Sequence, residues 1–413
     1  MGFSRSHWRS SFYGMLAVFA AGLYMASSGL AAHAQTFRVI HYFTGAGDGA
    51  YPSFPISINQ YGALFGTTSD GGIRNCDGGG CGVVFKVAFR SSGWIFDTLY
   101  EFSNGSDGSL PNGPVAFDRS GAVYGAGWGN FEIYELRPSP NRSASVIAPW
   151  NINVLYGLGE APNGDLVVDT AEQVFGTTDG GAFDEGTVFQ LTPAGNGWSE
   201  NTLYAFQGGA DGADPAFGVI EDGSGNLYGV TRSGGTANCG TVFELVNTGS
   251  NWTKTILHNF QGMIEGCQPS GALSRDTAGN LYGNTLYSGY GQDAGTVYRL
   301  SPAGASWTFA ILRTFNPGGP VGSIALDADG NVYGTTNGGG AYNFGSLFQL
   351  SQAGDGWTYT SLHDFMCPQD GCSPTGVAID STGNFFGLMN SGGRIAQYCD
   401  SGCGTLWELA QPR

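Results

Sequence analysis

Positive charge is scarce in this sequence of 413 residues, which has only two lysines, Lys86 and Lys254. Lysine and arginine together number 16 against 33 aspartates and glutamates, and the formal net charge is -17. The sequence has no cluster of basic residues beside aromatic residues, so it lacks the signal of a protein that binds DNA or RNA through phosphate contacts. We therefore expect no nucleic-acid partner.

Several repetitive architectures are also missing. Glycine does not recur at every third position, which excludes collagen, and no heptad pattern is long enough for a coiled coil. Charged residues reach only 12%, but hydrophobic residues make up 41%, so the composition is not that of a disordered chain. Glycine is abundant instead, with 71 residues, more than twice its usual share of roughly 7%. These values predict a folded, turn-rich protein.

A long apolar run occurs only near the N-terminus. Arg5 and Arg9 precede an apolar stretch that ends in Ala-His-Ala before Gln35. This pattern predicts a signal peptide over residues 1–34 that is cleaved after export, with a retained membrane anchor as the alternative. The mature chain, 35–413, is then one domain without a transmembrane segment. We expect it to be secreted, extracellular or held at the cell surface, and the periplasm remains open.

Eight cysteines remain in the mature chain, an even number that favours disulfides in an exported protein. Three close pairs stand out and two cysteines remain to pair with each other. The pairs are Cys76 with Cys81, Cys367 with Cys372, Cys399 with Cys403, and Cys239 with Cys267. Zinc is the competing interpretation, but the spacings are not those of the usual zinc knuckles.

Internal repeats give the strongest structural signal. One motif is a turn followed by a strand, seen in DGSGNLYG (222–229) and DADGNVYG (327–334), and a second is GTVFQL (186–191) and its variants. A third begins with Trp and ends with Phe, as in WTKTILHNF (252–260), and a fourth is an apolar segment that ends in Asp, as in FGVIED (217–222). Apolar and polar residues alternate in each, so all four are predicted to be strands.

The repeats predict an all-β fold, a seven-bladed β-propeller of four-stranded antiparallel blades. The four strands of a unit are called a (FGVIED), b (GNLYG), c (GTVFEL) and d (Trp to Phe) in chain order. Seven units over the mature chain give about 54 residues each, the size of a propeller blade. The chain starts with a d strand, FRVIHYF (37–43), and ends with a c strand, GTLWEL (404–409). We expect these ends to pair and close the ring.

Two details of the repeat carry further expectations. The unit near residues 143–191 is irregular, because GDLVVDT (164–170) and QVFGTT (173–178) both resemble strand b, and a blurred d strand lies near Val146 to Trp150. The tryptophans of strand d are expected to pack between neighbouring blades. They are Trp94, Trp198, Trp252, Trp307 and Trp357.

The GNLYGTT-type strand, the loop TTDGG (177–181), the GTVFQL strand and the Trp-to-Phe strand together resemble the GloVer tandem-repeat family of exported bacterial proteins. The resemblance covers nearly all of residues 36–410, and strands a and b also resemble those of NHL-type propellers. It implies secretion or surface display and a propeller-like array. This chain lacks the C-terminal sorting anchor of some members, so we expect it to be released or held noncovalently.

The geometry of a propeller blade places the d-to-a and b-to-c loops on one face. All eight cysteines fall in these loops, as do carboxylates and aromatic rings of the kind that bind sugars. The predicted ligand-binding residues are Asp48, Tyr51, Asp107, Trp128, Phe183, Asp211, Asp214, Tyr287, Tyr290, Tyr342, Phe344, Asp370 and Tyr398. The competing interpretation is that the rings cover glycine-rich loops and that the acids are turn residues.

Catalytic and metal-binding motifs are weak. The three histidines of the mature chain, His41, His258 and His363, share one position on the outer strand and cannot converge. The DADGN segment (327–331) resembles half of an EF-hand loop but lacks the closing Glu, so it is interpreted as a turn. We predict no catalytic residue, no metal site and no cofactor, while calcium bound at an unlocated site stays open.

These observations favour a monomeric, exported binding module for carbohydrate or another cell-surface polymer. The first alternative is a polysaccharide hydrolase or lyase that uses loop carboxylates. The second is a structural repeat protein without a small ligand.

Overall fold

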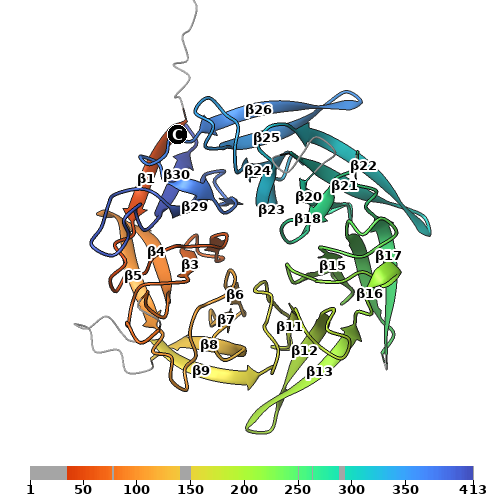
Figure 1. Ribbon diagram of the computed structural model, residues 1–413, viewed down its shortest axis with the longest axis horizontal. Helices are drawn as coiled ribbons and strands as arrows, with labels where there is room; N and C mark the ends of the chain where they lie inside the picture. Colours follow the sequence, from red (N-terminus) through yellow and green to blue (C-terminus); the bar gives the residue numbers. More distant parts are fainter. Residues whose placement is uncertain are drawn as a thin grey trace, which may run out of the picture.

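Seven antiparallel sheets surround a central axis as the blades of a propeller (Figure 1). The computed structural model describes residues 35–76, 79–139, 150–249, 251–262, 264–287 and 294–412, so the predicted signal peptide lies outside the described residues. The predicted seven-bladed fold is confirmed. Within the described ranges, no helix is long and apolar enough to cross a lipid bilayer.

The blades are numbered here in chain order, and each runs from the axis outwards. Blade 1 consists of β2 (Ser57–Ile58), β3 (Leu64–Thr68), β4 (Val83–Arg90) and β5 (Gly93–Glu101). Blade 2 consists of β6 (Ala116–Phe117), β7 (Val123–Gly127), β8 (Glu132–Pro138) and β9 (Trp150–Gly157). Blade 3 consists of β10 (Val167–Val168), β11 (Val174–Thr178), β12 (Thr187–Ala194) and β13 (Gly197–Ala205). Blade 4 consists of β14 (Val219–Glu221), β15 (Leu227–Thr231), β16 (Thr241–Asn247) and β17 (Trp252–Asn259). Blade 6 consists of β23 (Pro320–Leu326), β24 (Val332–Thr336), β25 (Ser346–Ala353) and β26 (Gly356–Asp364).

In blades 5 and 7 the innermost strand is split into two short pieces. Blade 5 consists of β18 (Cys267–Pro269), β19 (Ser274–Arg275), β20 (Leu281–Tyr287), β21 (Gly295–Ala303) and β22 (Ser306–Phe315). Blade 7 consists of β27 (Cys372–Pro374), β28 (Ala378–Ile379), β29 (Phe385–Ser391), β30 (Thr405–Ala410) and, as its outer strand, β1 (Thr36–Tyr42).

The two ends of the chain close the ring. β1 lies antiparallel beside β30, with Thr36 opposite Ala410 and Tyr42 opposite Thr405 (Figure 1). The carboxylate of Glu408 on β30 accepts hydrogen bonds from Arg38 on β1 and, at 3.0 Å, from the indole Nε1 of Trp94 in blade 1. The expected strand exchange between the termini is therefore confirmed, and Trp94 also joins the last blade to the first.

The structure resolves the irregular unit. Val167–Val168 is strand a of blade 3 and Val174–Thr178 is strand b. The expected d strand near Val146 to Trp150 was misplaced: the strand runs from Trp150 to Gly157, while Val146 lies outside the described residues. Leu158 follows this strand where the other repeats have their closing Phe, and its N–H donates to the carbonyl of Phe131, which explains the blurred motif.

Within each blade, an aromatic ring of strand c lies on a glycine of strand b. Phe243 is opposite Gly229 in the sheet, and a Cβ on Gly229 would lie 2.5 Å from the ring. The ring covers the glycine and keeps water away from it. This cross-strand pair leaves no room for a larger residue at the glycine position. The same pair occurs in the other blades as Phe85 on Gly66, Tyr134 on Gly125, Phe189 on Gly176, Tyr298 on Gly283, Phe348 on Gly334 and Trp407 on Gly387.

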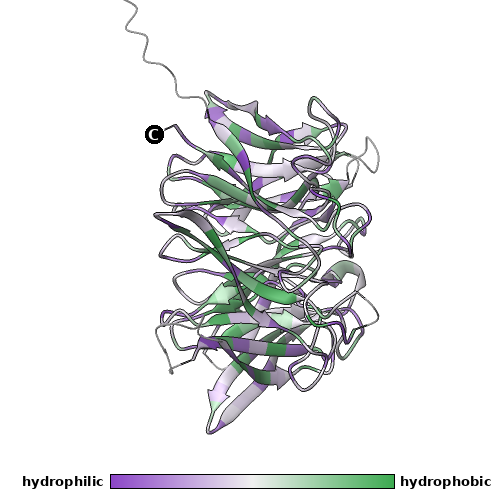
Figure 2. Ribbon diagram, turned by 90° about the vertical axis from the view of Figure 1, so that its left-hand side faces the viewer, coloured by the Kyte–Doolittle hydropathy of each residue, from purple (hydrophilic) through white to green (hydrophobic). Residues whose placement is uncertain are grey.

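Neighbouring blades pack through their apolar faces. The strand-d tryptophans pack between neighbouring blades, as predicted: the ring of Trp307 lies 6.1 Å from that of Tyr228 on strand b of the preceding blade, and the ring of Trp252 lies 6.3 Å from that of Phe175 in the same way. In side view, the apolar residues concentrate along the strands and the loops are more polar (Figure 2). The core is thus a series of apolar layers between blades.

A second contact between blades is formed by a proline and a glycine. The ring of Pro215, just before strand a of blade 4, lies on Gly186, just before strand c of blade 3, where a Cβ would be 2.2 Å from the proline Cδ. The residue before the proline, Asp214, donates its N–H to the carbonyl of Glu185 at 3.0 Å. We call this arrangement the inter-blade seam. Equivalent N–H donors and carbonyls are Tyr51 with Cys403, Leu110 with Cys81, and Gln268 with Cys239.

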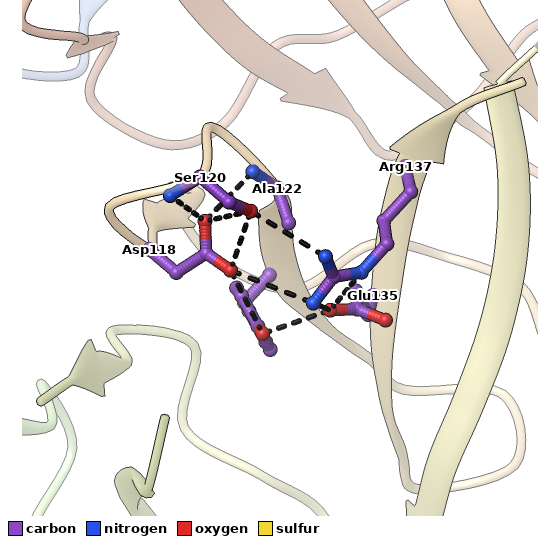
Figure 3. Close-up of polar contacts among 6 residues, drawn as sticks. Asp118, Ser120, Ala122, Glu135 and Arg137 are labelled. Carbon is purple, nitrogen blue, oxygen red and sulfur yellow. Dashed lines mark hydrogen bonds and ion pairs between the residues drawn. The ribbon is translucent and has the colours of Figure 1, made fainter. Parts of the chain in front are cut away.

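The turns between strands a and b explain the Asp-x-x-Gly-Asn motif. In blade 2, the carboxylate of Asp118 accepts the N–H groups of Ser120 and Ala122 at 2.8 and 2.9 Å (Figure 3). Arg137 joins this network through Glu135, with a shortest nitrogen-to-oxygen distance of 2.6 Å. The acid therefore caps a tight turn. We call this side of the disc the turn face and the other the loop-rich face.

Replacing Gly186 with alanine tests the seam. The added methyl group would clash with Pro215, and the backbone φ of +92° is also unfavourable for alanine. We expect Gly186→Ala to lower the free energy of unfolding by about 2–4 kcal/mol. The matched control is Gly195→Ala in a hairpin, where φ is also positive but no atom lies within 4 Å, so about 1 kcal/mol is expected. Denaturant unfolding measures both, and equal losses would contradict the role of the seam.

Candidate functional site

The loop-rich face carries all eight cysteines, and they form the four expected disulfides. Three of them close a single loop. Cys239 and Cys267 instead join the b-to-c loop of blade 4 to the start of blade 5, beside the seam contact of Gln268. Among the described residues no cysteine is free. The disulfides fix the loops of this face and fit an oxidising compartment.

Four of the predicted binding acids hold the loops at the outer edge of this face. Each accepts a hydrogen bond from a His or Tyr seven residues earlier on the outermost strand and another from a backbone N–H four residues earlier. Tyr100, for example, donates to Asp107 at 3.0 Å, and the N–H of Ser103 donates at 2.9 Å. The same arrangement joins His41 to Asp48, Tyr204 to Asp211, His258 to Glu265 and His363 to Asp370.

Glu265 was not among the predicted residues. It has the same seven-residue spacing from His258 as the four aspartates have from their partners, so the spacing was the signal that could have identified it. Burial would raise the pKa of Asp107, but the hydrogen bonds from Ser103, Gly105 and Tyr100 outweigh it and lower the pKa below its usual value. The structure therefore shows these acids as anchors of their own loops.

The histidines and their equivalents connect neighbouring blades. The imidazole of His258 stacks on the ring of Phe309 in the next blade, with ring centres 3.9 Å apart and planes within 1°. His41 stacks on Phe96 and His363 on Phe37 in the same way. Between blades 5 and 6, Arg313 takes the place of the histidine and Tyr359 takes the place of the phenylalanine. The guanidinium of Arg313 lies over the ring of Tyr359. The histidines lie in three separate blade contacts and do not meet.

Asp214 differs from the other predicted acids. It lies in the seam with a left-handed φ of 57°, and its side chain forms an ion pair with Arg232 at 3.5 Å while staying 38% exposed. Burial raises the pKa of Asp214, and the charge of Asp179 on the neighbouring blade adds to this, while Arg232 opposes it. Arg232 directly follows strand b of blade 4, and Trp128 occupies the same repeat position in blade 2.

The predicted aromatic residues divide into exposed and packed groups. Five side chains are exposed, and they are Trp128 (54%), Phe183 (54%), Tyr342 (53%), Phe344 (43%) and Tyr398 (44%). One face of the Tyr398 ring is covered by the guanidinium of Arg74, 3.6 Å from its centre. Tyr51 and Tyr287 are partly buried, and Tyr290 lies outside the described residues. The exposed rings are thus spread over b-to-c loops of different blades.

A cavity of about 330 Å³ lies where the inner strands of all seven blades converge. Sequence reasoning did not identify its distinctive residues, which are Phe54, Asp165 and Phe217. They depart from the repeat at their positions, and that departure is the signal that could have indicated them.

Possible metal ligands do not gather in the described residues, where no three His, Cys, Asp or Glu side chains come together. The Asp327 segment folds as a turn. Its carboxylate accepts hydrogen bonds from the backbone of Asp329 and Asn331, and from the hydroxyl of Tyr333 at 2.8 Å.

Replacing Asp107 with asparagine tests the anchoring role. The change keeps the shape but removes the charge that three donor residues stabilise, so we expect a loss of about 1.5–3 kcal/mol in unfolding free energy near pH 7. The lowered pKa means that this stabilisation exists above the unfolded-state value and disappears as the pH falls below about 4. The difference from wild type should therefore shrink in acid. The control is Asp184→Asn, on an exposed loop. If the loss of unfolding free energy in Asp107→Asn were unchanged in acid, this account would be contradicted.

Comparisons with known proteins support the fold. Residues 129–323 match the model of the Gloeobacter/Verrucomicrobia repeat, which confirms the family resemblance. Among curated proteins, none matches the sequence significantly.

Three solved structures have a similar fold. Virginiamycin B lyase from Staphylococcus aureus is 11% identical with a TM-score of 0.55, and the alignment covers 91% of this chain and 99% of the lyase. YCF48 from Cyanidioschyzon merolae is 13% identical with a TM-score of 0.54, over 90% and 98% of the two chains. PorZ, a surface component of the type-IX secretion system of Porphyromonas gingivalis, is 14% identical with a TM-score of 0.52, over 90% and 48%. At these identities the likeness concerns the fold alone. Residues 129–323 therefore match the Gloeobacter/Verrucomicrobia repeat, within a chain that folds as a seven-bladed β-propeller.

Proposed function

We propose that the protein is an exported binding module whose loop-rich face holds a carbohydrate or another cell-surface polymer. The observation that supports this most is the set of exposed aromatic rings on firmly held loops. Flat rings can stack on the CH faces of sugars, and rings in different blades suit an extended polymer. The predicted signal peptide and the four disulfides support export to an oxidising compartment.

The loops that present the rings are held by repeated contacts. In blades 3 and 6, a buried hydroxyl at the end of strand b bonds the hydroxyl that starts strand c, Thr178 with Thr187 at 2.7 Å and Thr336 with Ser346 at 3.4 Å. Phe183 and Tyr342 occupy the same position in these two loops, and the next residue in each, Asp184 and Asn343, has a left-handed φ. The two rings are therefore presented by loops that are held in similar ways, which keeps the entropy cost of binding low.

The alternative of a polysaccharide hydrolase or lyase draws support from Asp214. Burial raises its pKa, and a raised pKa is what a carboxyl group needs in order to act as a general acid. Asp179 would be the second carboxylate. Release of reducing ends or unsaturated products that is abolished by Asp214→Asn would favour this alternative.

Removing three of the exposed rings tests the binding proposal. We expect the triple variant Trp128→Ala, Phe183→Ala, Tyr342→Ala to lose at least about tenfold in retention on a polysaccharide column that retains the wild type, because each ring contributes about 0.5–1.5 kcal/mol. Its unfolding midpoint should stay near wild type, since these side chains are exposed. Tyr61→Ala is the matched control, because Tyr61 is 81% exposed on the turn face.

Two outcomes would contradict the proposal. One is equal retention of the triple variant and the wild type. The other is the absence of retention of the wild type on any of a panel of acidic and neutral polysaccharides, which would favour a structural repeat protein.

A further inference from the structure

The central cavity differs from the rest of the channel wall by a few residues that break the repeat. In five blades, the second residue after the seam proline is a glycine that packs against a neighbouring blade: a Cβ on Gly322, for example, would lie 2.1 Å from the carbonyl oxygen of Thr375. In blades 1 and 4 this position holds Phe54 and Phe217 instead, and both line the cavity. Two aromatic side chains therefore stand where the repeat has only hydrogen.

Asp165 is the third departure. It is the third residue after the seam proline of blade 3, where the other blades have uncharged residues, namely Pro55, Pro114, Gly218, Ala272, Ser323 and Val377. Among the described residues that line the cavity, Asp165 is the only charged one. No hydrogen bond or ion pair of its carboxyl group is found within the described residues. The repeat gives no structural reason for a carboxylate at this position.

Other polar groups of the cavity wall are already paired across the blades. Asn112 donates from Nδ2 to the carbonyl of Pro162 at 2.6 Å, and Asn163 donates to the carbonyl of Pro215 at 3.3 Å. Asn390 donates to the hydroxyl of Ser53 at 2.9 Å. These bonds fix the wall, whereas the carboxyl group of Asp165 has no such partner within the described residues.

Burial determines the charge state of Asp165. Protein atoms surround the carboxyl although water reaches it from the channel, and this burial raises its pKa to about 7 without a contribution from any charged neighbour. Arg232 lies 5.5 Å from the centre of the Phe217 ring and forms an ion pair with Asp214. Arg232 is thus committed to Asp214 and does not neutralise Asp165.

We infer that the central cavity binds a small polyhydroxylated molecule that carries one protonated amine, with Asp165 as the counter-ion of the amine. A single carboxylate matches a single positive charge, whereas a divalent metal ion usually takes several oxygen ligands with more negative charge. The volume of about 330 Å³ exceeds what an ion needs and lies in the range of small-molecule sites. Phe54 and Phe217 supply apolar surface for CH groups, and the amide and hydroxyl oxygens accept bonds from hydroxyls.

This inference concerns a site separate from the exposed rings, so the two proposals can fail independently. The probe is glucamine, a six-carbon polyol with one primary amine, and the matched control is sorbitol, which has a hydroxyl in place of the amine. Binding is measured by isothermal titration calorimetry on the full mature chain at about pH 8 and about pH 6. Calcium chloride is titrated in parallel.

We expect glucamine to bind the wild type at least about tenfold more tightly than sorbitol at the higher pH. Asp165→Asn should remove this preference and keep the fold, the column retention on polysaccharide and the weak sorbitol binding. The wild-type affinity for glucamine should fall about tenfold at the lower pH, because the ionised fraction of a carboxyl with a pKa of about 7 falls by that factor. The wild-type pH dependence tests the inference even if the variant does not fold.

Three results would overturn the inference. The first is equal binding of glucamine and sorbitol by the wild type. The second is a preference for glucamine that persists in Asp165→Asn, which would place the amine at another of the many surface acids. The third is calcium binding that depends on Asp165 and excludes glucamine, which would make the cavity a metal site.

Discussion

The contact of a proline ring with a glycine of the preceding blade is the constraint on which the arrangement of this molecule depends. Where Pro215 lies on Gly186 and Asp214 bonds Glu185, two blades approach each other with no room for an additional carbon atom. A similar approach recurs around the ring. Because the proline comes just before the innermost strand of its blade, the contact fixes the position of that strand and thereby the shape of the channel and of its mouth.

Different layers of each blade then serve different purposes. The strand interiors pair a ring with a glycine, as Phe243 does with Gly229, and fill the space between blades. At the outer edge, a stacked His or Tyr and a carboxylate seven residues later hold the long loops. The positions that remain free for variation are the exposed rings of the b-to-c loops and the few residues at the cavity. Both proposed binding sites lie at such positions.

The sequence was sufficient to predict the architecture because its repeats are also the contacts of the fold. The Gly of GNLYG, the Phe of GTVFEL and the Trp of the outer strand recur because each blade needs the same pairings, so their spacing indicated strands, their order and the closure by both termini. The strand from Trp150 to Gly157 was misplaced because Leu158 replaces the closing Phe. A single substitution at the end of a strand was enough to blur its pattern.

The candidate site was less predictable for a physical reason. Residue type alone cannot distinguish a carboxylate that binds a ligand from one that holds its own loop, and Asp107 is of the second kind. Asp165, Phe54 and Phe217 were missed because a search for recurring motifs passes over the residues that break them. In a repeat protein, the exceptions to the pattern hold as much information about function as the pattern holds about the fold.

Amide hydrogen exchange tests the central role of the seam most directly. If the seam holds the blades together, the N–H groups of Tyr51, Leu110, Asp214 and Gln268 open only when the whole ring unfolds, so their protection should equal that of Val242 in the middle of a blade. Exchange of these four amides at the fast rate of Gly223, in an exposed turn, would contradict the account.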